Sequence, residues 1–354
     1  MLDESKLEKE ITTDAVDFSF GELLNLHRDG EIIIRPEYQR LFRWSTEQRS
    51  RLIESVLLRL PIPPIFLVEN DSNILELIDG LQRTSSVLQF LDHTAIGEPE
   101  LILSGCDILP ALNGVKFSDL STSLKFKIKR TPIRAIIIKK SGDQYVKYEM
   151  FKRLNTGGSL LSAQEIRNCS SRMVDGGEHF YSVIQNLANE QNFLKAIERL
   201  PDPSRERRGD EELVLRFFAV KNYRDGYKGN IEEWLDSYME DVLLQHHAFD
   251  AASESGHFNR VFNLISAAFM DGAFSRFKST GDSTGRLAPA YFEAVVGAVS
   301  DELPAIEGKD VSTLRAKLID AFAHADFLAS TGPGANSIEK FRKRIDVVKA
   351  YLLV

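Results

Sequence analysis

The chain contains little cysteine: Cys106 and Cys169 are the only two among 354 residues. Two thiols are too few for a disulfide framework or a cysteine-rich zinc site, and they suit a reducing compartment. The sequence also lacks an apolar run long enough to span a bilayer. Its first 17 residues are polar and acidic, unlike a secretory signal or a transit peptide. We therefore expect a cytoplasmic protein with no membrane partner.

Patterns that bind metals or supply nucleophiles are also scarce. The seven histidines are scattered, and the adjacent pair His246 and His247 points to different sides of a helix rather than at one metal ion. No serine or cysteine stands near a histidine in a recognisable nucleophile arrangement. The sequence therefore indicates neither a histidine metal centre nor a covalent hydrolase.

Positive charge is in deficit, because 44 Lys and Arg against 52 Asp and Glu give a net charge of -8 at pH 7. Proteins that coat phosphate backbones are usually basic, so constitutive non-specific DNA binding is disfavoured. Two local clusters of cations are typical either of a solvated surface, the commoner case, or of a nucleic-acid groove. They comprise Lys125, Lys127, Lys129, Arg130, Arg134, Lys139 and Lys140, and Arg205, Arg207 and Arg208.

The hydrophobic content of 43% is enough for a core in each of two domains. In the first part of the chain, Ser19 with Glu22 and Ser45 with Gln48 read as capping boxes that open helices. Behind Ser45, apolar residues recur at helical spacing as far as Leu60, and Pro61 stops that helix. The other elements expected there are strands over residues 32–34, 65–68, 74–78 and 133–138, and helices over residues 22–28 and 84–91.

From about residue 144 onward the apolar spacing is almost wholly helical. We therefore predict an α+β fold, with a small mixed α/β domain over residues 1–143 and a mainly helical domain over residues 144–354. Ser162 and Glu165 cap one of its helices. The other helices are expected over residues 146–154, 180–189, 211–222, 231–242, 258–269, 289–299, 312–322 and 337–353.

The segment Leu75–Ser85 is the strongest candidate for chemistry. An apolar strand runs into Asp79 and Gly80 and then directly into a helix, which places unpaired helix N–H groups beside one loop. Arg83 can grip phosphate oxygens, and Asp79 can hold a magnesium ion or orient a water. Thr84 and Ser85 add hydroxyl donors. An aspartate N-cap followed by a surface arginine would show the same spacing, so both interpretations stay open.

Two further segments carry polar groups. Arg35–Trp44 holds three arginines and three aromatics in ten residues, which suits a site that stacks a base and neutralises phosphate. Aromatics packed in the core, with arginines paired to acids, would look the same. Phe151–Asn168 contains a Gly-Gly turn between two helices, which is typical of simple capping. Its functional interpretation adds Asn155, Arg167 and Asn168 as polar groups that face a pocket.

Taken in order, the three segments resemble the GmrSD restriction-endonuclease N-terminal family of the ParB/sulfiredoxin-like superfamily. Members carry Tyr-Gln-Arg…Trp, Asp-Gly-Gln-Gln-Arg and Leu-Asn-x-x-Gly…Leu-x-x-x-Glu-x-Arg-Asn. The matching positions here are Tyr38, Gln39, Arg40 and Trp44; Asp79, Gly80, Gln82 and Arg83; and Leu154, Asn155, Gly158, Leu161, Glu165, Arg167 and Asn168. Residues 211–219 and 227–230 extend the likeness along nearly the whole chain.

The resemblance implies a bacterial defence protein whose ParB/sulfiredoxin-like domain binds and hydrolyses a nucleoside triphosphate with Mg²⁺. It implies catalytic roles for Asp79, Gln82 and Arg83, with Asp79 as the metal ligand. The implied nucleotide-binding residues are Tyr38, Gln39, Arg40, Trp44, Gly80, Thr84, Ser85, Asn155, Gly158, Arg167 and Asn168. On this hypothesis Arg40 and Arg83 converge on one phosphate where two strands of one sheet end.

The chain departs from the family in two places. No His-Asn-His nuclease module follows Asn168, so we expect no self-contained DNA cleavage and a separately encoded nuclease as partner. Leu81 replaces the first glutamine of Asp-Gly-Gln-Gln-Arg, so nucleotide binding can persist where hydrolysis is weak. The leading hypothesis is a nucleotide-binding sensor subunit of a restriction system. The alternatives are a non-enzymatic module that binds DNA or a modified base, and a ParB-like nuclease.

Overall fold

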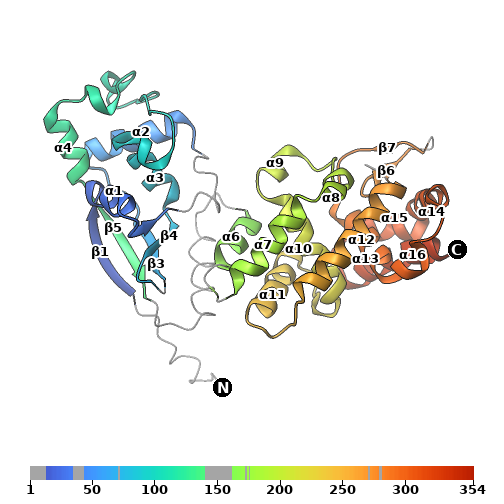
Figure 1. The fold of residues 1–354 in the computed structure, drawn as a ribbon. Helices are drawn as coiled ribbons and strands as arrows, with labels where there is room; N and C mark the ends of the chain where they lie inside the picture. Colours follow the sequence, from blue (N-terminus) through green and yellow to red (C-terminus); the bar gives the residue numbers. More distant parts are fainter. Residues whose placement is uncertain are drawn as a thin grey trace. The chain divides into compact units, whose positions relative to one another are not determined.

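The computed structural model describes residues 13–34, 44–70, 72–139, 162–171, 174, 176–269, 272–278 and 281–354. The chain divides into two compact units, Met1–Gly158 and Ser159–Val354. The first is a mixed α/β unit and the second is almost entirely helical, which confirms the predicted α+β class (Figure 1). Across the described ranges, no helix combines the length and the apolar character needed to cross a membrane.

A five-stranded mixed sheet forms the base of the first unit. Its strands are β1 (Thr13–Ser19), β2 (Ile32–Ile33), β3 (Ile65–Glu69), β4 (Leu75–Asp79) and β5 (Pro132–Ile138). They lie in the order β1-β5-β3-β4-β2. The pairs β1–β5 and β3–β4 are antiparallel, whereas β5–β3 and β4–β2 are parallel. The parallel pairing of β2 with β4 makes both strands end at the same edge of the sheet.

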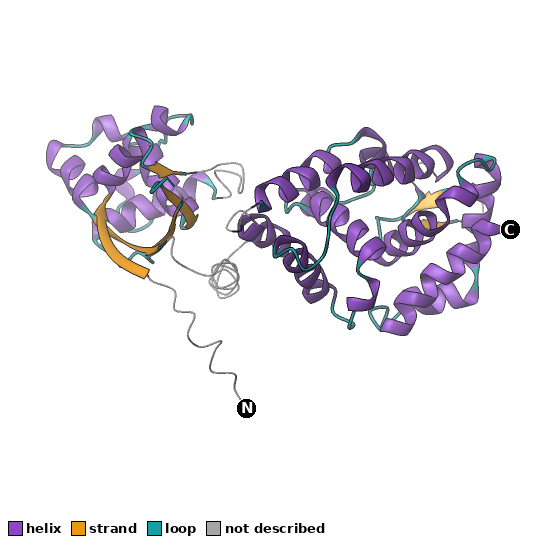
Figure 2. Ribbon diagram, turned by 60° about the horizontal axis from the view of Figure 1, so that its bottom comes forward, coloured by secondary structure: helices purple, strands orange, loops and turns teal. Residues whose placement is uncertain are grey.

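Helices pack on one face of this sheet, as Figures 1 and 2 show. They are α1 (Phe20–Arg28), α2 (Thr46–Leu58), α3 (Leu81–Leu91) and α4 (Thr122–Arg130), with short 3-10 turns η2 (His93–Ile96), η3 (Pro110–Leu112) and η4 (Phe117–Asp119). Ile133, Ala135 and Ile137 alternate along β5 and are buried in the same cluster as Phe20 and Val87 of the helices. The period of two in the strand thus directs one row of side chains into the core.

Most local predictions for this unit are confirmed. Both capping boxes form: the Glu22 and Gln48 N–H groups donate to the Ser19 and Ser45 hydroxyls at 3.2 and 3.3 Å. Some boundaries differ: α3 begins at Leu81 rather than at residue 84, and α2 ends at Leu58, so Leu60 lies outside it with 45% of its surface exposed. Pro61 disfavours helical backbone at the residue before it, so the helix closes earlier, at Arg59 in the left-handed region.

The edge strand β1 and the helix α4 were not predicted. Five of the seven residues of β1 are exposed, so the strand carries no apolar alternation that a sequence pattern could reveal. It forms because its backbone pairs with β5, and Asp17 forms an ion pair with Arg134 across that pairing. In α4 only Ile128 is buried, so its helical stripe is equally weak.

The second unit is a set of helices around an aromatic core. The helices are α6 (Ala163–Ser171), α7 (Gly177–Ala188), α8 (Gln191–Ala196), α9 (Asp202–Arg205), α10 (Gly209–Asn222), α11 (Ile231–Leu243), α12 (Ala251–Phe269), α13 (Pro289–Ile306), α14 (Val311–Ala323), α15 (Ala325–Thr331) and α16 (Ile338–Leu353), with η5 (Arg224–Gly226) and a hairpin of β6 (Arg276–Phe277) and β7 (Ser283–Thr284). Phe217 and Phe262 flank Phe258 with ring centroids 5.0 and 4.4 Å away. The helix predicted over residues 146–154 lies outside the described residues.

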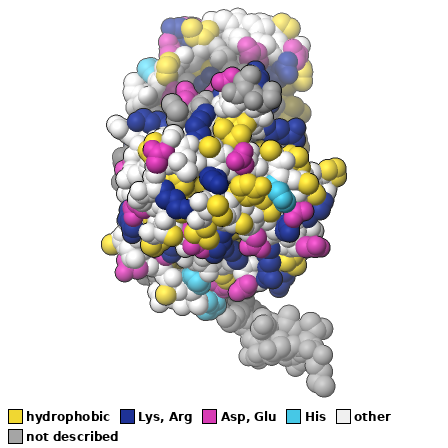
Figure 3. All heavy atoms as spheres, turned by 90° about the vertical axis from the view of Figure 1, so that its right-hand side faces the viewer, with side chains coloured by type: hydrophobic (Ala, Val, Ile, Leu, Met, Phe, Trp, Pro, Cys, Tyr) yellow, Lys and Arg dark blue, Asp and Glu magenta, His cyan; other side chains and the backbone are white. Residues whose placement is uncertain are grey.

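Charges of both signs cover the part of the helical unit that carries α14 and α16. In Figure 3, Lys and Arg side chains are interspersed with Asp and Glu on the face drawn. Lys343 and Asp326 join α16 to α15 at 2.8 Å, and Lys349 and Glu302 join α16 to α13 at 2.5 Å. Exposed pairs of this kind contribute little to stability. The face drawn therefore shows no accumulation of one sign of charge.

Candidate functional site

The turn between β4 and α3 depends on Gly80. Its backbone has φ +97°, a left-handed conformation that side chains rarely adopt. A Cβ at this position would lie 3.0 Å from Cβ of Ile65 on β3 and closer still to its Cγ2. Gly80 thus lets the β4–α3 turn pass directly over the neighbouring strand. Asp79 ends β4 on one side of this turn, and Leu81 begins α3 on the other.

The start of α3 offers backbone donors. Gly80 is the N-cap residue and supplies no side-chain cap to the first turn of the helix. The first N–H groups of a helix lack intrahelical partners and carry the positive end of the helix dipole. The turn therefore presents donors and positive potential beside Asp79, an arrangement suited to an anion.

Arg83 folds back over the turn toward Asp79. One of its terminal nitrogens, Nη2, donates to Asp79 Oδ2 at 2.9 Å and to the Pro64 carbonyl at 3.0 Å. Its Nε is buried and has no partner among the described residues. Arg83 thus forms an ion pair with Asp79, and the N-cap of α3 is Gly80 rather than Asp79. Since a guanidinium has five N–H donors, these contacts orient Arg83 and leave donors for a ligand.

Thr84 and Ser85 lie deeper than the sequence suggested. Their side chains are 1% and 0% exposed, and neither hydroxyl oxygen has a hydrogen-bond partner among the described residues. Ser86, by contrast, donates to the Gln82 carbonyl at 2.6 Å. Buried polar atoms in folded proteins nearly always have partners. Two such hydroxyls and Arg83 Nε, all within three residues, are consistent with a polar ligand near this turn.

The described end of the segment Arg35–Trp44, which is Trp44, contacts the β4–α3 turn. β2 precedes this segment and lies beside β4 in parallel, so the predicted placement of both strands in one sheet is confirmed. At the far end, the Trp44 N–H donates to Gln82 Oε1 at 3.3 Å. Tyr38, Gln39 and Arg40 lie outside the described residues, so the convergence of Arg40 with Arg83 stays a prediction.

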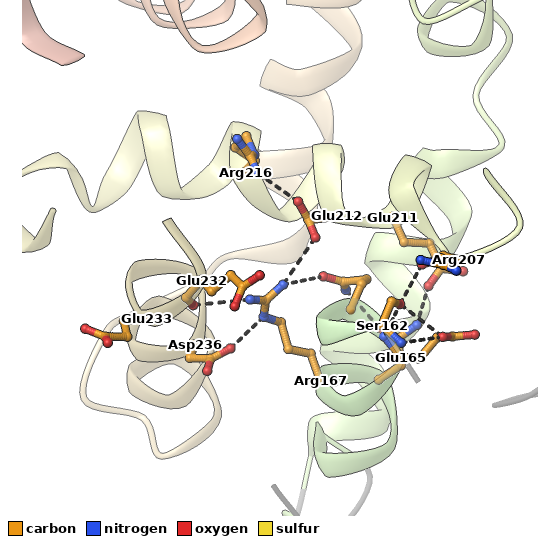
Figure 4. A network of polar contacts seen from close by, with 12 residues as sticks. Ser162, Glu165, Arg167, Arg207, Glu211, Glu212, Arg216, Glu232, Glu233 and Asp236 are labelled. Carbon is orange, nitrogen blue, oxygen red and sulfur yellow. Dashed lines mark hydrogen bonds and ion pairs between the residues drawn. The ribbon is translucent and has the colours of Figure 1, made fainter. Parts of the chain in front are cut away.

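The third motif lies in the helical unit. The predicted cap of α6 is confirmed: the Glu165 N–H donates to the Ser162 hydroxyl at 3.3 Å, and Glu165 Oε2 accepts from the Ser162 N–H at 2.8 Å. Arg167 is 2% exposed and directs its Nε to Asp236 Oδ1 of α11 at 2.7 Å (Figure 4). Asn155 and Gly158 lie outside the described residues.

Arg167 and Asn168 are themselves buried and contact polar groups of α10 and α11. Arg167 Nη2 donates to the Glu232 carbonyl at 3.2 Å, and Nη1 lies 3.6 Å from Glu212 of α10. Asn168, which is 0% exposed, accepts from Gln164 at 2.9 Å and donates to Glu211 of α10. These contacts join α6 to α10 and α11. Their use in nucleotide binding stays a prediction, whereas their part in holding three helices together is visible in the geometry.

The same network continues through α10 to the last helix. Burial opposes ionisation of Glu212, but the Arg216 and Arg167 charges outweigh it and hold the pKa of Glu212 below its usual value. Arg216 Nη1 donates to Glu293 Oε1 at 2.7 Å, and Glu293 also accepts from Arg344 of α16. The sequence held no signal for these partners, because they lie 51 to 77 residues apart.

Metal ligands do not gather in the described part of the chain, where no three His, Cys, Asp or Glu side chains could hold one ion together. Asp79 is thus a single carboxylate at the turn. Mg²⁺ is commonly bound by one or two carboxylates together with substrate phosphates and waters. The donor set therefore fits a magnesium ion that arrives with a phosphate, rather than an ion bound by protein alone.

Comparison with known proteins identifies one family. Residues 20–171 match the model described as the GmrSD restriction endonuclease, N-terminal domain. The matched range begins with α1, includes the β4–α3 turn, and ends at the last residue of α6. No curated protein matches the chain.

Proposed function

We propose that the chain, whose residues 20–171 match the GmrSD restriction endonuclease N-terminal domain, is a nucleotide-binding sensor subunit of a restriction system. The binding site is the β4–α3 turn, Asp79–Ser85. Its ligand is a nucleoside triphosphate with Mg²⁺. The match supports the GmrSD N-terminal family that the sequence resembles, and the nucleotide is our addition.

The observation that supports the site best is the position of Arg83. Its Nη2 is held by Asp79 and Pro64, while its buried Nε lacks a described partner. A guanidinium fixed by a carboxylate loses little freedom when it donates to a phosphate, so more of the energy of each hydrogen bond contributes to affinity. The uncapped start of α3 adds backbone donors to the same place.

The residues of the turn have separable roles in this proposal. Arg83 and the first N–H groups of α3 bind phosphate oxygens. Asp79 holds the magnesium ion, and Gln82, whose Oε1 already accepts from Trp44, positions a water for hydrolysis. Tyr38, Gln39 and Arg40 complete the site. The Gln82–Trp44 contact would then link occupancy of the turn to the segment Arg35–Trp44.

A partner nuclease follows from the same premise. The family name describes a restriction endonuclease, and nucleotide binding at the turn would regulate a nuclease supplied by another chain. DNA is the substrate of that partner. The alternative function, a non-enzymatic module that binds DNA or a modified base, predicts DNA affinity with no effect of nucleotide.

The test measures nucleotide binding by the full chain. ATP, GTP, CTP and UTP, each with Mg²⁺, are screened by thermal shift, since a ligand that binds only the native state raises the melting temperature. The dissociation constant of the best nucleotide is then measured by calorimetry. Arg83→Ala should weaken it by one to two decades, because a charged hydrogen bond contributes about 1.5–3 kcal/mol. Phosphate release measures hydrolysis separately.

Two variants control this test. Arg51→Ala removes an exposed arginine paired with Asp107 in the same unit, and it should leave the dissociation constant unchanged. Arg83→Lys keeps the charge but lacks the planar fork, so it should recover part of the affinity at most. If no nucleotide raises the melting temperature, or if a folded Arg83→Ala protein binds as tightly as the parent, the proposed function is wrong.

A further inference from the structure

A groove in the first unit lies between the end of α2 and the length of α4. Its volume is about 690 Å³. Residues 59–62 line one wall and residues 123–132 supply the other. This volume falls within the range of about 300–1,000 Å³ that is typical of ligand pockets. The groove is distinct from the β4–α3 turn, since none of the residues 79–85 lines it.

The charged side chains that line this groove are all cations. Arg59 stands on the α2 wall, and Lys127 and Arg130 stand on α4 one turn apart. No Asp or Glu is among the lining residues. Within the described ranges, none of the three cations forms an ion pair. In a chain with net charge -8, an uncompensated basic groove indicates an anionic partner.

Neighbouring cations of the same basic cluster have partners elsewhere. Arg134 and Lys139 pair with Asp17 and Asp14 of β1 at 2.5 and 3.1 Å. Lys125 donates to the Ser118 carbonyl at 2.6 Å. The sequence placed all these cations in one cluster with Lys127 and Arg130. The fold divides that cluster and leaves the two groove cations unneutralised by described residues.

An exposed aromatic ring lies beside Arg130 in this groove. Phe126 lines the groove with 49% of its surface exposed, one residue before Lys127 on α4. The Arg130 guanidinium lies 4.9 Å from the centre of its ring. Leu60, 45% exposed, is on the opposite wall. Cations beside a solvent-facing aromatic ring form the combination that binds a nucleic-acid strand with an unstacked base.

We propose that the groove between α2 and α4 binds a single-stranded stretch of DNA. Arg59, Lys127 and Arg130 contact successive phosphates, and one base stacks on Phe126. A strand fits better than a membrane because the surface is concave and cations stand on both of its walls. This inference rests on the restriction-system part of the proposed function. It does not depend on nucleotide binding at the Asp79–Ser85 turn.

Fluorescence anisotropy of the full chain with a labelled single-stranded oligodeoxynucleotide tests the groove. Lys127→Glu with Arg130→Glu should weaken binding at least tenfold. The same double variant should reduce the slope of log K against log salt by about 1.4, or roughly 0.7 for each of the two phosphates no longer neutralised. Phe126→Ala should weaken binding about tenfold, because stacking of one base contributes about 1–3 kcal/mol. Phe126→Trp should retain the affinity for the oligonucleotide, because it keeps an aromatic ring on which the base can stack.

Controls separate this site from general charge effects and from the nucleotide site. Lys195→Glu changes an exposed cation on α8 of the helical unit and should leave DNA affinity unchanged. The groove variants should keep the thermal shift of the parent with nucleotide, and Arg83→Ala should keep its DNA affinity. If the parent chain binds the oligonucleotide but no nucleotide raises its melting temperature, the proposed function is refuted and the groove proposal stands.

Three results would overturn the groove proposal. The first is no DNA binding by the parent chain. The second is a DNA affinity that falls as far in Lys195→Glu as in the groove variants, or a DNA affinity that Phe126→Ala leaves unchanged. The third is a preference for anionic phosphatidylserine vesicles over the oligonucleotide that disappears in the charge-reversal variant, since that would assign the groove to a membrane surface.

Discussion

Replacement of Glu293 tests the buried charge network of the helical unit. Glu293 is 1% exposed on α13. Its Oε1 accepts from Arg216 of α10 at 2.7 Å, and its Oε2 accepts from Arg344 of α16. One carboxylate thus neutralises two buried guanidinium groups and joins three helices. Glu293→Ala removes this carboxylate and leaves both cations in place.

The two arginines differ in what they retain. Arg216 keeps its ion pair with Glu212 at 2.7 Å. Arg344, which is 0% exposed, keeps only the Ala335 carbonyl, at 2.6 Å, among its described hydrogen-bond acceptors. Removal of one partner of a buried pair costs about 3–5 kcal/mol, because an uncompensated charge remains. Since a domain is stable by about 5–15 kcal/mol, Glu293→Ala should lose a large part of the unfolding free energy of the helical unit.

Denaturant unfolding followed by tryptophan fluorescence measures the loss. Trp234 is 2% exposed, and its ring centre lies 5.5 Å from that of Phe341 on α16, so its emission reports on this unit. Glu307→Ala is the matched control, because it removes an exposed ion pair with Arg260 at the end of the same helix. The denaturant concentration at the unfolding midpoint should fall far more for Glu293→Ala than for Glu307→Ala.

A double variant separates charge from packing. Glu293→Leu combined with Arg344→Met replaces a buried pair by apolar groups of similar length, and such replacements are often neutral. It should therefore be more stable than Glu293→Ala. A loss below about 1 kcal/mol for Glu293→Ala, or one no larger than that of Glu307→Ala, would show that the network does not stabilise the unit as we argue.

Two further predictions concern the first unit. Gly80→Ala should lower the unfolding free energy of the first unit by more than about 2 kcal/mol, because the cost of a left-handed backbone and a close contact with Ile65 add together. Gly114→Ala is the control: Gly114 has φ +85° and a Cβ there would meet no atom within 4 Å, so this variant should show only the backbone cost. Equal losses of unfolding free energy by the two variants in urea would contradict this prediction. Hydrogen bonds from Thr94 and Arg28 lower the pKa of Asp92 from 3.8 to about 2. The contribution of Asp92 to the unfolding free energy is therefore fully present above about pH 4 and is lost as the pH falls through about 2. The melting temperature of the parent should accordingly decline more steeply across that window than that of Asp92→Asn, and parallel curves would rule this contribution out.

Much of the fold follows from interactions between residues close in sequence. The capping boxes at Ser19, Ser45 and Ser162 form as predicted, because a hydroxyl and a carboxyl or amide three residues apart meet on any helix start. Strands β3, β4 and β5 follow from apolar runs between turn residues. The Asp-Gly junction likewise locates the candidate site at the end of β4 from adjacent residues alone.

Other features depend on contacts between distant residues, and only the tertiary structure decided them. β1 forms through its pairing with β5, in which Asp17 meets Arg134 from 117 residues away. A strand whose partner lies so far along the chain leaves no trace in its own sequence. The sequence did not show which distant residues Arg167 would contact, and several of its partners come from α10 and α11.

The basic groove shows the same division between local and long-range information. The sequence placed Lys127 and Arg130 in a basic cluster, but it contained no sign that Arg59 would face them from another helix. Helix starts, strand alternation and the glycine turn are set by backbone and neighbour geometry, which a few adjacent residues determine. Which charges are neutralised, and which face a common groove, depends on how elements far apart in the chain pack together, and no local pattern records that packing.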